Sequence, residues 1–479
     1  MYNSIQQFNK FGFKKIEKTI ETFLTEKKDI SDLVIGLEES LYELGRNILE
    51  EVLEEMDEGI FESKERKKRY EAVRKNDENS LLTSFGMITY NRRYYRSKES
   101  GEYKHLVDER VGIQPHDRVS ADVVIRALDE ATQSSYRKAG TNVAYDSDLT
   151  KQAVMNKVHE IEVVDAPLRF SEKKSLRVLY IEADEDHVAL QNKPRGDDEK
   201  QKSGISMPKL VYVHEGIDTE KSTFKRNVLK NVRYFGGDFK SEDLWLKVAQ
   251  YIDDQYDEET IETIYISGDG ASWIRQGLHW IPKSRFVLDN HHMNKYIRVA
   301  TAHLPDEMMY YAIRDSIEYP DKKMTAAAFD KVIGMTESDT KKRAVREAKR
   351  YILNNWDGIE IKEEKADEIV GCSAEGHVSH VFSERLSSRP KGWSRVGADQ
   401  MARLRIYKKN GGKIYDLVMG QKKKEQKEKH IQEQEELLSR FRRASARYED
   451  TVNTNLTVLQ TGHKTALYKA LRGLSGRCG

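Results

Sequence analysis

Hydrophobic positions spaced by three or four residues predict a long amphipathic helix near the start of the chain. Between residues 31 and 58 they form one stripe, while glutamates cover much of the remaining surface. Such a helix either packs on its own domain or pairs with a second copy of the chain. The stripe consists of Leu33, Leu37, Leu41, Leu44, Ile48, Val52 and Met56.

Alternating side chains replace the helical spacing after residue 80. The alternation from Thr83 to Thr89 and the β-rich composition up to Tyr95 predict paired strands, with a turn in the ESGE sequence. We expect a small β-rich segment here.

Arginines and tyrosines are interleaved in this β-rich segment. Arg92, Arg93 and Arg96 stand beside two tyrosines, a mixture suited to phosphate contact and base stacking. An exposed strand edge that carries cations is an equally good interpretation, so DNA contact by these arginines is a hypothesis.

Helical spacing returns between residues 119 and 166. A short helix, a loop with Gly140 and a second helix form the outline of a helix-turn-helix motif. The second helix carries Lys151, Gln152 and Lys157, which would face DNA in such a motif. The outline also arises by chance in proteins that bind no DNA.

From about residue 174 the pattern predicts an α/β sheet. Three strand-like segments joined by turns come first, in LRVLYIEADEDHVALQ, PKLVYVHEG and NVLKNVRYFGG, and helices then alternate with strands. This order indicates that the first three strands are antiparallel. A charged, all-helical stretch from 301 to 370 interrupts the sheet region, and a helix beginning near Ser373 follows it.

These patterns define a multidomain α+β fold class. The expected regions are 1–75 helical, 76–118 β-rich, 119–166 helix-turn-helix-like, 170–300 first part of the core, 301–370 helical insertion, 371–420 second part of the core, and 421–479 a charged helical end.

Composition narrows the class of protein. The chain has 479 residues, 34% charged and 38% hydrophobic, with 24 Tyr and 14 Phe as core anchors. Two cysteines exclude a disulfide framework and a four-cysteine zinc site. No apolar run is long enough for a membrane span, and the start lacks a secretory signal, so we expect a cytoplasmic protein. The net charge of +1 does not itself indicate a nucleic-acid partner.

Three acidic residues stand out by position. Asp184 interrupts an otherwise apolar strand, Asp269 follows a strand between two glycines, and Glu375 begins a helix. Carboxylates from two strand ends and one helix can converge on hard divalent cations such as Mg²⁺. Glu182 and Asp186 lie on the same strand face as Asp184, so either could replace it.

The order of strands and acids predicts a ribonuclease-H-like nucleotidyltransferase core. Two ions held there could generate the attacking hydroxide and stabilise the leaving oxygen in phosphoryl transfer. Taken singly, each acid is better explained as a solvated turn residue.

Several longer phrases resemble those of bacterial ISLre-type insertion-sequence transposases. They are LYIEADEDHVALQ, YISGDGASWI, FVLDNHHMNKYI and CSAEGHVSHVFSERLSSRPKGWS, with TSFGMITYNRRYY, LVDERVGI and SSYRKAG upstream. The resemblance covers residues 80–420, and that family resembles the Mutator-like transposases. It implies an Asp184, Asp269 and Glu375 triad that binds two Mg²⁺ or Mn²⁺ ions, with Asp289 and His292 as active-site support.

The function implied by this resemblance is transposition of an insertion sequence. The protein would cleave the element's ends and join their 3′-hydroxyls to target DNA, as a homo-oligomer associated with the bacterial nucleoid. The alternatives are a catalytically silent DNA-binding protein or repressor, and a ribonuclease-H-like nuclease without strand transfer.

Overall fold

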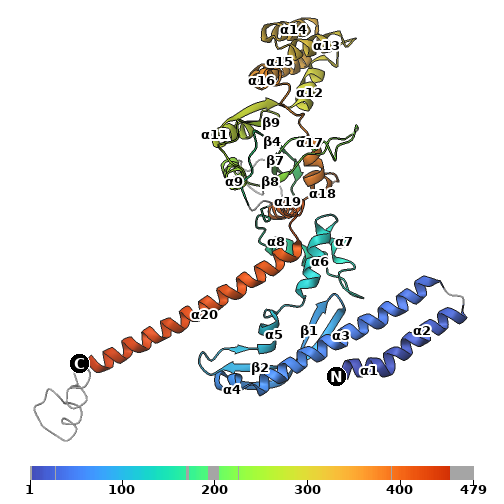
Figure 1. Cartoon of the computed structure of the whole chain (residues 1–479), viewed down its shortest axis with the longest axis vertical. Coiled ribbons are helices and arrows are strands. Elements are labelled where there is room, and N and C mark those ends of the chain that lie inside the picture. The colour runs from blue at the N-terminus through green and yellow to red at the C-terminus, as the bar shows by residue number, and fades with distance from the viewer. Residues whose placement is uncertain are drawn as a thin grey trace, which may run out of the picture. The chain divides into compact units, whose positions relative to one another are not determined.

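The computed structural model describes residues 3–26, 29–168, 172–191, 204–224, 226–389 and 391–453. It is a mixed α+β structure (Figure 1). The chain divides into one unit of residues 1–109 and 113–418 and a second unit of 110–112 and 419–479, described here separately.

Helices form the start of the first unit. They are α1 (Asn3–Gln7), the π-helical η1 (Phe8–Gly12), α2 (Phe13–Thr25), α3 (Ile30–Glu62) and α4 (Lys64–Arg69). The predicted amphipathic helix is therefore α3, and it is longer than its apolar stripe indicated. Asp29 caps it by accepting a hydrogen bond from the Ser31 backbone N–H at 2.8 Å.

A three-stranded sheet follows, built from β1 (Tyr70–Thr83), β2 (Gly86–Ser97) and β3 (Tyr103–Lys104). The predicted helical region of 1–75 is wrong at its end, because β1 begins at Tyr70. The first half of β1 is mostly exposed and charged, so it lacks the alternation that marks a half-buried strand. The β1–β2 turn precedes Gly86, whose φ is +112°, and the predicted ESGE turn joins β2 to β3 instead.

The acidic surface of α3 is explained by its contact with β2. Glu50, Glu54 and Asp57 accept hydrogen bonds from the backbone N–H groups of alternate β2 residues, at 2.7, 2.8 and 3.2 Å. Leu53 of α3 packs with Leu81 and Ile88 of the hairpin. The helix thus covers strand N–H groups that would otherwise need water or another strand.

Four helices lead to the central sheet: α5 (Leu106–Val111), α6 (Ala121–Ala131), α7 (Tyr136–Gly140) and α8 (Lys151–Glu160). The helix-turn-helix outline corresponds to α7 and α8, which pack on each other and on α6. Gly140 permits this packing, because a Cβ there would lie 2.1 Å from the Leu149 carbonyl oxygen. Thr150 caps α8 by accepting from Ala153 N–H at 3.2 Å.

The central sheet has five strands in the order β10-β9-β4-β7-β8. Strands β4, β7 and β8 are antiparallel neighbours, whereas β9 is parallel to β4 and β10 to β9. The prediction that the first three core strands are antiparallel is confirmed. Their bounds are β4 Val178–Glu185, β7 Lys209–His214, β8 Arg233–Gly237, β9 Thr263–Gly268 and β10 Ser284–Leu288; a short ribbon pairs β5 Val188–Ala189 with β6 Ile205–Ser206.

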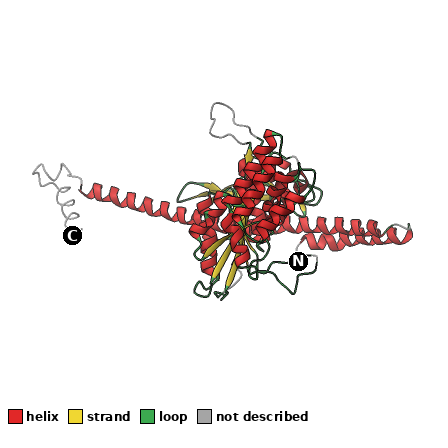
Figure 2. Ribbon diagram, turned by 90° about the horizontal axis from the view of Figure 1, so that it is seen from above, coloured by secondary structure: helices red, strands yellow, loops and turns green. Residues whose placement is uncertain are grey.

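Helices pack on both faces of this sheet, so that its strands lie among helices in Figure 2. Leu179, Ile181 and Ala183 of β4 lie in one core. Helix α9 (Ser241–Gln255), helix α10 (Ser272–Arg275) and the helices between residues 290 and 364 contribute to the same core. Tyr212 of β7 belongs to the core on the other face. The alternation of side chains along each strand creates this division.

The remaining helices are α11 (Gly277–Trp280), α12 (Asn290–Thr301), α13 (Met308–Glu318), α14 (Lys322–Met335), α15 (Asp339–Asn354), α16 (Trp356–Glu364), α17 (Ala374–Val378), η2 (Ser379–Ser383), α18 (Glu384–Leu386), α19 (Arg395–Lys409) and α20 (Ile414–Asn453). Helices α13–α16 occupy the stretch predicted to be a helical insertion.

Most of α20 belongs to the second unit, where Lys422 Nζ donates to the Gly112 carbonyl oxygen at 3.1 Å. Residues 454–479 of the predicted charged end lie outside the described residues. No described helix is long and apolar enough to cross a membrane.

Candidate active site

The strand register brings Asp184 and Asp269 side by side. Strands β4 and β9 pair in parallel up to Glu182 opposite Ser267. Two residues further, the same register sets Asp184 opposite Asp269. Paired residues on neighbouring parallel strands lie about 5 Å apart and share one face of the sheet. Both carboxylates therefore stand at the carboxyl-terminal edge of the parallel strands.

Asp184 is half-buried and lacks a side-chain partner. Its Oδ1 accepts a hydrogen bond from the Glu185 backbone N–H at 2.8 Å, and no described side chain hydrogen-bonds to it. Burial raises the pKa of Asp184 to about 6. The negative charges of Asp269 and Glu185 also raise this pKa, whereas the charge of His292 lowers it. The site is thus short of positive charge.

Glu182, the first alternative to Asp184, is fully engaged in the protein interior. Its carboxylate accepts hydrogen bonds from the Tyr212 hydroxyl, from His214 Nε2 at 3.0 Å and from the Ser373 backbone N–H. Gly216 N–H donates to His214 Nδ1, which leaves Nε2 to donate to Glu182. Burial alone would raise the pKa of Glu182, but these hydrogen bonds outweigh it and lower the pKa.

Asp186, the second alternative, is also occupied. Both of its carboxylate oxygens accept from the Ser387 hydroxyl at 2.9 Å, and Oδ1 also accepts from the His187 N–H. Glu182 thus binds the residue before α17, and Asp186 binds the residue after α18. Of the three acids on this face of the strand, Asp184 alone is left without a side-chain hydrogen bond among the described residues.

A tight turn places Asp269 at the end of β9. Its Oδ1 accepts from the Ala271 N–H at 2.8 Å, and its carbonyl oxygen accepts from the Tyr351 hydroxyl at 2.6 Å. Gly270 has a φ of +83°, and a Cβ there would lie 2.3 Å from Asn355 Oδ1. Glycine is required at this turn for both reasons.

Asp289 follows β10 and continues the row of strand-end carboxylates. It caps α12 by accepting from the His291 and His292 N–H groups, and it contacts His292 Nδ1 at 2.8 Å. The hydrogen bond to Asp289 raises the pKa of His292, whose charge also interacts with Asp184 and Asp269. The structure therefore shows helix capping by Asp289, and the charge of the His292 that it holds acts on both Asp184 and Asp269.

Glu375 lies in the first turn of α17, at the same edge of the sheet. Its carboxylate contacts His291 Nδ1 at 2.9 Å, and its side chain is 62% exposed. The helix that carries it continues into the π-helical η2. Short π-helical segments are rare and are frequent at functional sites.

The chemistry of these residues suits a divalent cation. Asp184 and Asp269 offer hard oxygen donors beside each other, and the raised pKa of Asp184 indicates that a nearby positive charge would be stabilising. Within the described residues, no three His, Cys, Asp or Glu side chains stand close enough to hold an ion. Glu375 would have to turn from His291 to become a third donor.

The arginines of β2 are used inside the protein more than the sequence indicated. Arg92 forms an ion pair with Asp108, and Arg93 with Asp57 at 2.7 Å as well as with Glu58. Arg96 is exposed. Of the three arginines, Arg96 is therefore the one available to a ligand without loss of an internal ion pair.

Helix α8 contributes to a basic groove of about 430 Å³, whose lining contains no Asp or Glu. Lys151 and Gln152 line it, whereas Lys157 is paired with Glu160 at 2.9 Å. Sequence reasoning missed Arg137 and Lys391, which also line the groove. The RK pair of the SSYRKAG phrase was a usable signal, but Lys391 comes from a distant segment that only folding brings near.

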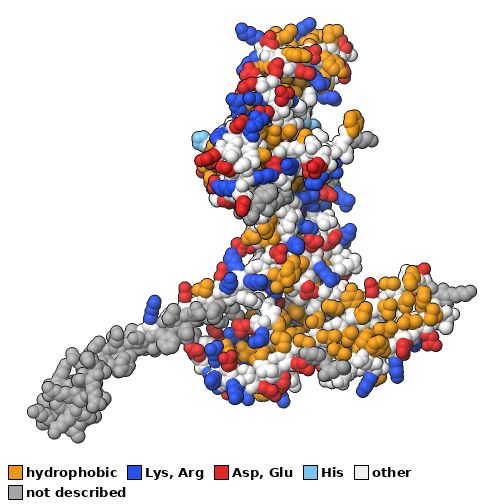
Figure 3. Space-filling view, viewed as in Figure 1, with side chains coloured by type: hydrophobic (Ala, Val, Ile, Leu, Met, Phe, Trp, Pro, Cys, Tyr) orange, Lys and Arg blue, Asp and Glu red, His pale blue; other side chains and the backbone are white. Residues whose placement is uncertain are grey.

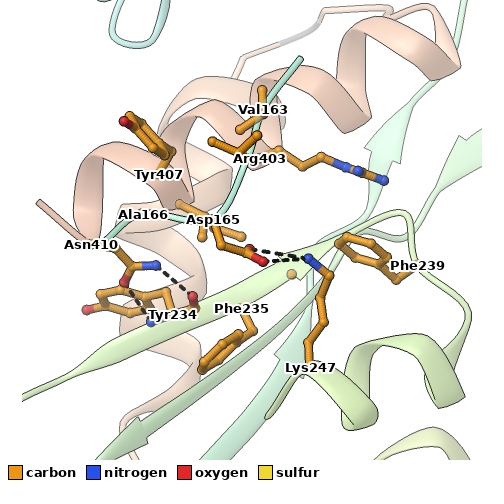
Figure 4. Close-up of a pocket in the computed structure, with 13 residues that line it drawn as sticks. Val163, Asp165, Ala166, Tyr234, Phe235, Phe239, Lys247, Arg403, Tyr407 and Asn410 are labelled. Atoms are coloured by element: carbon orange, nitrogen blue, oxygen red, sulfur yellow. Dashed lines mark hydrogen bonds and ion pairs between the residues drawn. The ribbon is translucent and has the colours of Figure 1, made fainter. Parts of the chain in front are cut away.

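A second hollow, of about 40 Å³, lies where helix α19 packs against the sheet (Figure 4). Asn410 exchanges two 2.8 Å hydrogen bonds with the Tyr234 backbone of edge strand β8, and Lys247 forms an ion pair with Asp165 at 2.9 Å. Its volume suits one or two water molecules. It fixes α19 against the sheet and offers no room for a substrate.

Relatives of the chain are bacterial proteins. UPF0236 proteins of Caldanaerobacter subterraneus subsp. tengcongensis are 43% and 42% identical over 465 residues, covering 96% of this chain and 95% of each relative. The name of the second joins eleven locus designations. A UPF0236 protein from Streptococcus gallolyticus, named for its position in a vanSb 3′ region, is 26% identical and covers 68% of this chain and 72% of its own.

Among solved structures, the Drosophila P element transposase strand transfer complex is similar at 11% identity, with 64% of this chain and 82% of that chain covered. Its TM-score of 0.21 is too low to establish a shared fold. The model of the family described as "Uncharacterised protein family (UPF0236)" matches residues 23–423. The chain therefore belongs to the UPF0236 family.

Proposed function

We propose that this UPF0236 protein is a DDE-type DNA transposase, which cleaves the ends of an insertion sequence and joins them to target DNA. The observation that carries the proposal is the parallel register of β4 and β9, which pairs Glu182 with Ser267 and, when continued by two residues, sets Asp184 opposite Asp269. Asp184 is also the acid of its strand face whose carboxylate is not hydrogen-bonded by a described side chain.

The strand order supports a ribonuclease-H-like core. Three antiparallel strands are followed by two parallel ones on the other side of β4, so β4 is central. The helix with Glu375 is bound to β4 through Glu182 and Asp186. This is the arrangement expected when two strand-end acids and one helical acid serve one reaction centre.

In the proposed reaction, Asp184, Asp269 and Glu375 would hold two Mg²⁺ or Mn²⁺ ions, and Glu375 would turn from His291 to do so. Such ions would lower the pKa of an attacking water and stabilise the leaving 3′-oxygen. Asp289 fixes the start of α12 and thereby holds His292, whose positive charge lies close enough to favour the ionised form of both aspartates.

DNA would bind along the basic groove beside α8. Lys151, Gln152, Arg137 and Lys391 offer cations and an amide in a surface without competing carboxylates. Arg96 extends the set, whereas Arg92, Arg93 and Lys157 would contact DNA only after releasing their ion pairs. We infer that Lys151, Gln152 and Arg137, rather than the β2 arginines, are the main DNA contacts.

The relatives add an independent argument. Eleven locus designations on one relative's name are what repeated insertion of a mobile element leaves in a genome. A bacterial transposase of this kind acts in the cytoplasm on nucleoid DNA, and two element ends must be held together, which requires a homo-oligomer.

The test is an end-joining assay with the full chain, Mg²⁺, labelled element ends and a supercoiled target. The expected product is labelled end covalently joined to target, lost in Asp269→Asn and retained in Asp186→Asn. Cutting without joining would favour a nuclease. Specific end binding without any cutting would favour a silent DNA-binding protein or repressor.

A further inference from the structure

The α2–α3 hairpin carries an apolar face that nothing in the described chain covers. Phe13, Ile20 and Leu24 of α2 are 50%, 40% and 72% exposed. Ile30, Val34 and Leu41 of α3 are 60%, 46% and 56% exposed. Figure 3 shows hydrophobic side chains gathered over these two helices.

Helical geometry places the six side chains on one side of the hairpin. The two helices contact each other through other positions, since Thr19 fills the space beside Gly36 and Lys15 binds Glu39 and Glu43 at 3.2 and 3.0 Å. Seen from this contact, the α2 stripe and the α3 stripe both turn toward the same face, because the helices are antiparallel.

The second half of α3 is covered by the protein itself. Leu49 and Leu53, on a neighbouring face of the helix, pack against the β1–β2 hairpin. The apolar residues of the first half have no such cover among the described residues. An amphipathic helix that is half covered in one copy of the chain indicates a second contact for the other half.

We propose that the occupant of this face is a second copy of the chain, with two hairpins forming a four-helix bundle. Six large apolar side chains, each about half exposed, present on the order of 500 Å². With the polar rim, this approaches the ~800 Å² that each partner buries in a standard interface. A polar peptide or a nucleic acid would leave this surface without an apolar partner.

The test is the molar mass of the full chain in solution, by light scattering and sedimentation equilibrium without DNA. The unmodified protein should have twice its 55.6 kDa chain mass. Leu24→Glu with Val34→Glu should weaken dimerisation at least about 100-fold, since each dimer would bury four unpaired charges. The matched control is Ile35→Glu, which is 60% exposed on the same helix but lies off this face; it should remain dimeric.

Far-UV circular dichroism would show whether the charged variants fold. If they lose helix, the milder pair Ile20→Gln with Leu41→Gln serves the same purpose. A monomeric unmodified protein overturns the proposal. So does a dimer that survives both pairs of substitutions, because its contact then lies elsewhere. The proposal concerns association alone and does not depend on the proposed catalytic function.

Discussion

The carboxyl end of β4 and the middle of β2 make an instructive comparison. At the end of β4, three acids share one face, Glu182, Asp184 and Asp186, with Glu185 between the last two; β2 carries three arginines, Arg92, Arg93 and Arg96. In each case the fold satisfies two of the three with internal partners and leaves one. The remaining members are Asp184 and Arg96.

The two regions differ in what the internal partners do. On β4, Ser373 N–H donates to Glu182 and the Ser387 hydroxyl donates to Asp186, which fixes the α17–α18 segment to the sheet, so the acids position the helix that carries Glu375. On β2 they are carboxylates of Asp57 and Asp108 that join the hairpin to α3 and α5. Most residues of a charge cluster in the sequence can therefore be structural. The residue without an internal partner, Asp184 or Arg96 here, is the better candidate for a functional role.

The largest expected effect is catalytic. Asp184→Asn should reduce DNA cleavage on the order of 10³-fold or more, because a carboxylate shared by bound cations is lost. Asp186→Asn is the matched control, since an amide oxygen can still accept from Ser387, and it should stay within about tenfold of the unmodified protein. Cleavage rates on labelled ends measure both. Equal losses in the two variants would end the distinction between these acids.

Stability should show the opposite order along the same strand. Glu182→Gln should destabilise the fold by about 2–4 kcal/mol, because the amide cannot accept from the Tyr212, His214 and Ser373 donors together. Asp184→Asn should leave stability unchanged or raise it, since it removes an unfavourably buried charge. Urea unfolding of both proteins gives the comparison. A stability loss for Asp184→Asn as large as that for Glu182→Gln would contradict it.

The arginines of β2 should divide in the same way, with smaller effects. Arg93→Ala should cost about 1–3 kcal/mol of folding free energy, because Asp57 is left nearly buried without its ion-pair partner. Arg96→Ala should change stability by less than about 0.5 kcal/mol. If DNA contacts Arg96, the same change should lower the salt slope of DNA binding by about one. Unfolding curves and salt titrations of binding test the two parts separately.

The last comparison concerns pH and metal. The pKa of Asp184 is raised to about 6 from its ordinary 3.8, so its contribution to stability is favourable at low pH and is lost as pH rises through about 6. Without metal, the melting temperature of Asp184→Asn should rise relative to that of the unmodified protein as the pH increases from about 4 to about 7. Added Mg²⁺ should then stabilise the unmodified protein more than the variant. A pH-independent difference that Mg²⁺ does not alter would contradict the assignment.

Sequence patterns gave reliable predictions where the residues that determine a structural feature all lie in one segment of the chain. The α3 stripe, the antiparallel order of the first core strands and the strand-end positions of Asp184 and Asp269 follow from spacing, connection length and glycine placement. The start of β1 was missed, because its exposed charged residues resemble the end of a helix and its pairing with β2 lies outside the segment.

The sequence by itself determined which residue types stand at strand ends and helix starts, because local backbone preferences set those places. Only the tertiary structure decided which of the β4 acids is left without a side-chain partner. The reason is that hydrogen-bond partners come from far along the chain: Ser373 lies 191 residues from Glu182, and Ser387 lies 201 residues from Asp186. Strand alternation gives the three acids the same face, and the helix that folds onto that face distinguishes them.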